Sequence, residues 1–133
     1  MSSNVEGKIY ANKSIEEILG NYQNFISCIP SVKDIKDRKF KLDAQVDGFN
    51  VTVDGELSTF QKEGQSYIYG LKISGPGVTI TITTTYKVQG NEISWSSQYK
   101  YEGFAVTMIG SLLDTTIQNM ITTTNECIKA KLT

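Results

Sequence analysis

The chain has 133 residues, 39% of them hydrophobic and 20% charged, and a formal net charge of −1; this composition is typical of one globular domain and excludes a disordered or membrane-spanning chain. It contains no histidine, which excludes the Ser-His-Asp and Cys-His catalytic arrangements and the HExxH metal motif. The near-neutral charge also argues against a nucleic-acid partner, because phosphate recognition needs clustered Lys and Arg.

The first part of the chain predicts one strand followed by two short helices. Residues 5–11 alternate between apolar and polar side chains, as a strand does. Ser14 followed three residues later by Glu17 has the capping-box spacing that starts a helix. Asn21 can cap a second short helix, which Pro30 terminates.

From there to about residue 102 the sequence alternates with a period of two and predicts about six antiparallel strands. Asp47-Gly48 is the strongest hairpin signal, because both residues of such a turn take a positive φ. Residues 79–85 carry Thr at every second position, as solvent-facing sheet surfaces commonly do. We therefore expect a meander with one wet face and one covered face.

The last part of the chain, residues 104–131, changes to a helical period and predicts an amphipathic helix of about seven turns. Met108, Leu112, Thr116 and Met120 form one stripe along it, and Ile or Leu residues flank this stripe. We expect the stripe to face the sheet.

This order of elements predicts one α+β domain over residues 1–133, in which a curved antiparallel sheet of about seven strands wraps around the C-terminal helix. Two short helices follow the first strand. A single helix cannot fill the concave side of such a sheet, so we expect a cavity roofed by the two short helices.

Four short motifs accompany this order of elements: Ser14-Ile15-Glu16-Glu17-Ile18-Leu19, Cys28-Ile29-Pro30-Ser31-Val32, the pair Gly75 and Gly77, and Gly103 with Gly110. With these motifs the chain resembles the START-like (SRPBCC) superfamily, which has the helix-grip fold, and most closely the carbon monoxide dehydrogenase G-subunit family. The resemblance implies a ligand-binding domain with a hydrophobic cavity. The family usually has glycine after the Cys-Ile-Pro stretch, where this chain has Ser31.

Several polar or amphipathic side chains interrupt the apolar stripes and are candidates to line that cavity. Thr84, Ser97 and Thr116 need hydrogen-bond partners if buried, and either neighbouring carbonyls or a ligand could supply them. The aromatic residues are either plain core or ligand contacts. We expect the cavity between Trp95, Tyr99 and Met120. The complete set of expected ligand contacts is Phe40, Phe49, Tyr67, Tyr69, Ile82, Thr84, Trp95, Ser97, Tyr99, Met108, Leu112, Thr116 and Met120.

Three functions are compatible with these patterns. The first is a binding or carrier protein for a small hydrophobic ligand such as a fatty acid, lipid or isoprenoid. The second is a cyclase- or dehydratase-like enzyme, for which Tyr99 and Ser97 would be the polar pair. The third, implied by the resemblance alone, is an accessory protein for a molybdenum-type dehydrogenase. We expect no catalytic residue, metal or cofactor, and we expect Asp114 to be solvated.

Compartment and cysteine use complete the sequence-based expectations. No segment approaches the roughly 20 apolar residues that cross a bilayer, and no apolar signal region precedes the first strand, so we expect a cytoplasmic protein. Cys28 and Cys127 are either buried free thiols or one bridge between the first helical segment and the last helix, which is plausible mainly in a hyperthermophile. Besides a dehydrogenase, a second copy of the same chain is a possible protein partner, which would give a homodimer.

Overall fold

The computed structural model describes residues 2–46 and 48–133, and the side chains of Ser2, Val46 and Phe49 lie outside the described part. The expected Asp47-Gly48 turn therefore lies partly outside it as well. The elements are β1 (Ser2–Tyr10), α1 (Ile15–Leu19), α2 (Tyr22–Ser27), β2 (Val32–Lys36), β3 (Lys39–Val46), β4 (Phe49–Glu63), β5 (Ser66–Gly75), β6 (Val78–Gln89), β7 (Glu92–Glu102) and α3 (Val106–Leu132).

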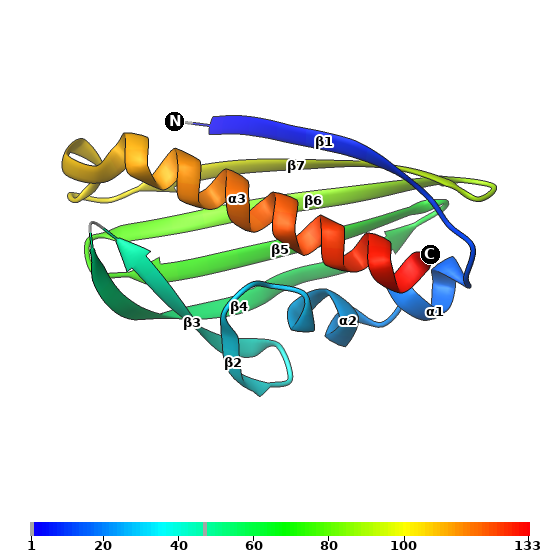
Figure 1. Ribbon diagram of the computed structural model, residues 1–133, viewed down its shortest axis with the longest axis horizontal. Helices are drawn as coiled ribbons and strands as arrows, with labels where there is room; N and C mark the ends of the chain where they lie inside the picture. Colours follow the sequence, from blue (N-terminus) through cyan, green and yellow to red (C-terminus); the bar gives the residue numbers. More distant parts are fainter. Residues whose placement is uncertain (1, 47) are drawn as a thin grey trace.

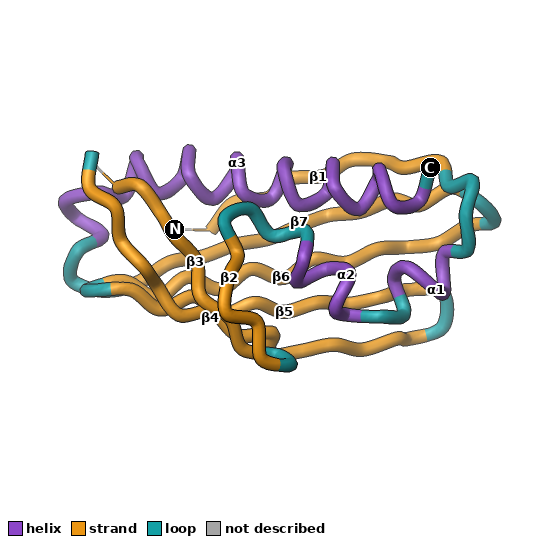
Figure 2. Tube along the Cα trace, turned by 60° about the horizontal axis from the view of Figure 1, so that its bottom comes forward, coloured by secondary structure: helices purple, strands orange, loops and turns teal. Residues whose placement is uncertain are grey.

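The strands form one antiparallel sheet in the order β1-β7-β6-β5-β4-β3-β2. Strands β2 to β7 follow one another as a meander, and β1 pairs with the far edge of β7. The helix α3 lies across one face of the sheet, with α1 and α2 on the same side (Figures 1 and 2). The α+β helix-grip arrangement expected from the order of elements is confirmed.

Local capping signals set both short helices. The Ser14 hydroxyl accepts a hydrogen bond from the Glu17 amide at 3.3 Å and starts α1. The Asn21 side chain accepts one from the Gln23 amide at 3.1 Å and starts α2. Such bonds satisfy amides that have no partner within the helix, so the positions of both helices follow from the sequence.

Aromatic side chains fill the space between the short helices and the sheet. Phe25 of α2 stacks on Tyr69 of β5 with the ring centroids 4.3 Å apart. Tyr86 of β6 meets Tyr69 edge to face at 5.8 Å, and the Tyr69 hydroxyl donates to the Leu19 carbonyl. Burial raises the pKa of both phenols, so they stay neutral hydrogen-bond donors. The region that was expected to be a cavity under α1 and α2 is therefore solid core.

The face of α3 that packs on the sheet differs from the expected stripe. Met108 is 84% exposed and Leu112 is 39% exposed. The stripe one residue further along is buried instead, because it carries branched aliphatic side chains along most of the helix, and its two polar members, Thr124 and Asn125, bond to carbonyls of the same helix. The buried positions are Leu113, Ile117, Ile121, Thr124, Asn125, Ile128 and Leu132.

A disulfide joins Cys28 to Cys127, with the two Cα atoms 5.5 Å apart. Cys28 follows the last residue of α2, and Cys127 lies in the last third of α3. Of the two alternatives left by the sequence, the structure has the bridge. It fastens the short helices covalently to the C-terminal half of α3.

Candidate ligand-binding cavity

A cavity of about 330 Å³ lies between the N-terminal half of α3, the inner face of strands β3 to β6 and the loop after α2. Its volume is near the lower end of the roughly 300–1,000 Å³ that is usual for small-molecule sites. The residues that line it are Pro30, Ser31, Leu42, Asp43, Ala44, Gln45, Val53, Ile73, Gly75, Val78, Ile80, Leu113, Thr116, Ile117, Asn119, Met120 and Thr123.

Aliphatic side chains from neighbouring strands form the floor of the cavity. Leu42 of β3 is directly opposite Val53 of β4, and Ile73 of β5 is opposite Ile80 of β6. Leu42, Ile73 and Ile80 are buried. Burial of apolar ligand surface against such a floor is favourable by about 25 cal/mol per Å².

Small residues on the inner face leave the space open. Ala44 lies on the same face of β3 as Leu42, and Gly75 ends β5. A Cβ placed on Gly75 would come within 3.1 Å of a Val53 methyl group. Gly55 has the opposite effect, because the Phe40 ring already occupies the space above it. Val53 thus fills the space beside Gly75 as Phe40 fills that beside Gly55, and the open volume lies next to the small Ala44 side chain.

The loop after α2 forms one rim of the cavity. Ser31 has a φ of 62°, a left-handed conformation that glycine adopts at little cost and other residues seldom adopt. Serine thus adopts here the backbone shape for which the family resemblance led us to expect glycine. The Ser31 carbonyl accepts the Asp43 amide at 3.2 Å and holds the loop against β3.

The polar side chains on the α3 side of the rim are uncharged. Thr116 is half-buried, and its hydroxyl donates to the Leu112 carbonyl at 2.9 Å. Of the two partners expected for this hydroxyl, a neighbouring carbonyl or a ligand, the structure shows the carbonyl. Asn119 and Thr123 are exposed at the cavity edge. These groups offer neutral donors and acceptors to a ligand whose apolar part is buried below them.

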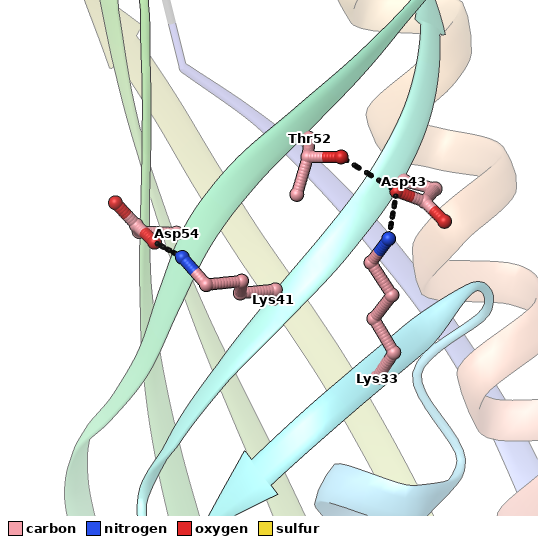
Figure 3. Close-up of polar contacts among 5 residues, drawn as sticks. All are labelled: Lys33, Lys41, Asp43, Thr52 and Asp54. Carbon is pink, nitrogen blue, oxygen red and sulfur yellow. Dashed lines mark hydrogen bonds and ion pairs between the residues drawn. The ribbon is translucent and has the colours of Figure 1, made fainter.

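The charged residue at the rim, Asp43, is already paired. Its carboxylate accepts hydrogen bonds from the Lys33 ammonium at 2.9 Å and the Thr52 hydroxyl at 2.8 Å (Figure 3). These bonds, that of Lys33 first, lower the pKa of Asp43 below its ordinary value. Asp43 alternates with the inward Leu42 along β3 and is opposite Thr52, so its carboxylate lies on the outer face of the sheet.

A second, larger depression of about 660 Å³ lies along β2 to β5 and is lined mainly by charged and polar residues. Lys41 and Asp54, which line it, form an exposed ion pair at 2.8 Å (Figure 3). Such surface pairs contribute little energy, and the depression offers little apolar surface to a ligand. We therefore place the candidate site in the smaller, aliphatic cavity.

The expected ligand contacts are distributed over several parts of the structure. Thr116 and Met120 line the cavity. Trp95 is half-buried and packs over Gly7 of β1, where an added Cβ would lie 2.8 Å from the indole. Met108 and Leu112 face solvent, and the Phe49 side chain lies outside the described part. The remaining residues are buried but do not line the cavity: Phe40, Tyr67, Tyr69, Ile82, Thr84, Ser97 and Tyr99.

Buried polar groups that were candidate ligand contacts bond to one another instead. Thr84 and Ser97, which are cross-strand neighbours, share a hydrogen bond of 2.6 Å. The Tyr99 hydroxyl donates to Asp114 at 3.1 Å and accepts from the Gln118 amide at 2.9 Å. Asp114 is thus half-buried and paired, contrary to the expectation of a solvated carboxylate. Tyr99 and Ser97 do not form the polar pair that the enzyme hypothesis needs.

Several lining residues do not stand out in the sequence. Leu42, Val53 and Ile73 were assigned to the covered faces of strands, but nothing singled them out from the rest of the core. The small residues Ala44 and Gly75 were the feature of the sequence that could have indicated the cavity, because a small side chain on a covered face fills less of the interior than a large one.

The fold defines the class of protein to which the chain belongs. The sheet, the two short helices and the long C-terminal helix form the START-like helix-grip fold. A conserved protein from Geobacillus kaustophilus has a TM-score of 0.65 and 15% identity, with 99% of this chain and 95% of that chain covered. Truncated norcoclaurine synthase from Thalictrum flavum has a TM-score of 0.66 and 10% identity over 97% and 91% of the two chains.

The di-domain aromatase/cyclase StfQ from the steffimycin biosynthetic pathway has a TM-score of 0.63 and 12% identity; the match covers 98% of this chain and 51% of that one. These likenesses show the fold. The chain belongs to the CoxG family, the family of the carbon monoxide dehydrogenase G-subunit, whose model matches residues 7–133. Among curated proteins, none matches the sequence significantly.

The helices of the structure are too short or too polar to cross a bilayer. Within residues 2–46 and 48–133, none of them combines the length and the apolar character that a membrane span needs.

Proposed function

We propose that the protein binds or carries a small hydrophobic molecule in the cavity beneath the N-terminal half of α3. The observation that supports this most directly is the cavity of about 330 Å³ with an aliphatic floor and an uncharged rim. Each buried CH₂ group of a ligand would contribute about 0.8 kcal/mol. The sequence suggested fatty acids, lipids or isoprenoids, and all three are apolar enough for this floor.

The cavity itself can be tested by filling it. Ala44→Leu adds three carbon atoms to the inner face of β3, whereas Thr83→Leu introduces the same side chain on the exposed outer face of β6. We expect 1-nonanol to raise the Tm of the natural protein and of Thr83→Leu, and to have little effect on Ala44→Leu. Thr116→Leu fills the same cavity from α3 and serves as a second variant if Ala44→Leu folds poorly.

Two readouts decide the result. Native mass spectrometry of the freshly purified protein detects a retained ligand. Differential scanning calorimetry measures the shift in Tm, and a ligand at 100 times its Kd stabilises the folded state by about 2.7 kcal/mol. Equal shifts in Ala44→Leu and Thr83→Leu would place the binding elsewhere. No shift with any apolar compound would contradict the proposal.

Membership of the CoxG family supports a second proposal, that the protein acts as an accessory to a dehydrogenase of the molybdenum type. The experiment is affinity purification of the tagged protein from its own cells, with the enzyme identified by mass spectrometry. Recovery of a dehydrogenase in stoichiometric amount supports the accessory role, and recovery of the protein alone counts against it. Light scattering of the same sample tests the homodimer, which stays a prediction.

The cytoplasmic location expected from the sequence also stays a proposal. It has to be compatible with the disulfide between Cys28 and Cys127. Reducing cytosol keeps most thiols free, and the known exceptions are mainly proteins of hyperthermophiles. A thiol assay on protein trapped with an alkylating reagent in intact cells would show whether Cys28 and Cys127 are joined there.

A further inference from the structure

We infer, on the basis of the proposed function, that the cavity takes an uncharged ligand of about ten non-hydrogen atoms and discriminates against the fatty-acid anion. The inference concerns the size and the charge of the ligand, and the two are argued from different observations. It narrows the three hydrophobic classes to short neutral molecules that carry an alcohol or carbonyl oxygen.

The size follows from the volume of the cavity. A group the size of a water molecule occupies about 30 Å³ in a liquid, so a cavity of about 330 Å³ holds on the order of ten such groups. The part of a longer chain beyond these groups would stay in water and add little to the binding free energy. A branched or linear molecule with eight to ten carbon atoms is therefore the expected scale.

The charge follows from the lining. Among the lining residues that the structure describes, none is Lys or Arg, and the ionisable one is Asp43. The Lys33 ammonium is bound to Asp43 on the outer face of the sheet, so it does not face the interior. A ligand carboxylate would find no cation along this lining, and any water that it lost at the rim would not be replaced by an ion pair.

A ligand amine is disfavoured for the complementary reason. Asp43 is the acidic residue among the described lining residues, and its carboxylate lies on the outer face of the sheet, bound to Lys33 and Thr52. The groups that remain at the rim are the Asn119 amide and the Thr123 hydroxyl, both exposed and both neutral. An alcohol or carbonyl oxygen can bond with either group and needs no counter-charge.

The experiment compares matched compounds with the natural protein at pH 7. We expect 1-nonanol to bind at least tenfold more tightly than nonanoate and nonylamine, and about as tightly as 1-hexadecanol, by displacement of the uncharged dye 1-aminoanthracene. If nonanoate or nonylamine binds as well as nonanol, the charge argument is wrong although the proposed function survives. Binding of hexadecanol more than tenfold tighter than that of nonanol overturns the size argument, because it would mean that the additional carbons are buried as well. Failure of all four compounds overturns the proposed function itself.

A designed change of charge gives an independent test. Thr123→Lys places a cation at the cavity edge, and Thr115→Lys places one on an exposed position of α3 that does not line the cavity. We expect Thr123→Lys to raise the affinity for nonanoate at least threefold relative to the affinity for nonanol, while Thr115→Lys leaves the ratio of the two affinities unchanged. The same gain in nonanoate affinity in both variants would come from the added positive charge of the protein as a whole and would contradict a carboxylate bound next to residue 123. Absence of a gain in Thr123→Lys would contradict it as well.

Discussion

Reduction of the Cys28–Cys127 disulfide is expected to destabilise the protein strongly while leaving the order of its elements intact. The bridge joins residues separated by 99 positions, so it constrains nearly three quarters of the unfolded chain. Cross-links stabilise a fold chiefly by removing conformations from the unfolded state, and the effect grows with the length of the closed loop.

The size of the effect follows from the loop. In the chain-entropy description a loop of about 100 residues contributes about 4.7 kcal/mol at 25 °C. At an unfolding entropy of about 2.1 cal/mol/K per residue, a chain of 133 residues loses roughly 15 °C of Tm when the bridge opens. Domains of this kind have a total stability of only about 5–15 kcal/mol, so the reduced protein should remain folded at 25 °C but with a small margin.

The assay is urea unfolding followed by circular dichroism, with and without a phosphine reductant. A double variant, Cys28→Ala with Cys127→Ala, is the control: it should match the reduced protein and should not respond to the reductant. Thiol titration in denaturant confirms that two thiols appear only after reduction. If oxidised and reduced protein differ by less than about 1 kcal/mol, the chain-entropy reasoning fails for this fold.

Two further outcomes are expected. The pKa of Asp43 is lowered by its hydrogen bonds to Lys33 and Thr52. Its contribution to stability is therefore complete above the ordinary carboxyl pKa of about 3.9 and is lost as the pH falls through the lowered value. An NMR titration should show the Asp43 pKa returning towards normal in Lys33→Met, and an unchanged pKa would contradict this. Tyr86→Phe removes the donor of the 2.5 Å hydrogen bond to buried Asn125 and should cost about 1–3 kcal/mol of unfolding free energy, whereas a loss below about 0.5 kcal/mol would contradict the importance of this bond.

Local signals in the sequence were sufficient for most of the fold. Alternation with period two located five of the six strands after the short helices, and Ser14 and Asn21 located the helix starts. These signals depend on neighbours a few residues apart, which the sequence displays directly. Strand β2 was not assigned its own bounds because it lies at the sheet edge with nearly all of its side chains exposed, so it has no apolar alternation to detect.

The position of the cavity depended on tertiary packing and was predicted only in part. Two stripes of α3, one through Met108 and one through Leu113, have similar spacing, and the contact with the sheet selects the second. The Phe25–Tyr69 stack fills one end of the concave side, whereas Ala44 leaves the other end open. The sequence of a single strand does not show which large residues meet across the sheet. The prediction of ligand contacts therefore agrees with the lining for Thr116 and Met120, whereas the predicted aromatic contacts do not line the cavity.

The division of α3 into a half over solid core and a half over a cavity has a consequence for motion. Its last turns are fixed by the disulfide and by the Leu132 carbonyl, which accepts the Asn12 and Lys13 amides. Its N-terminal half is bound to β7, because the Tyr101 hydroxyl donates to the Gly110 carbonyl at 3.1 Å and the Tyr99 hydroxyl donates to Asp114 at 3.1 Å. α3 is therefore held to the rest of the fold towards both of its ends, so any motion of the helix that widened the cavity would first have to break one of these contacts.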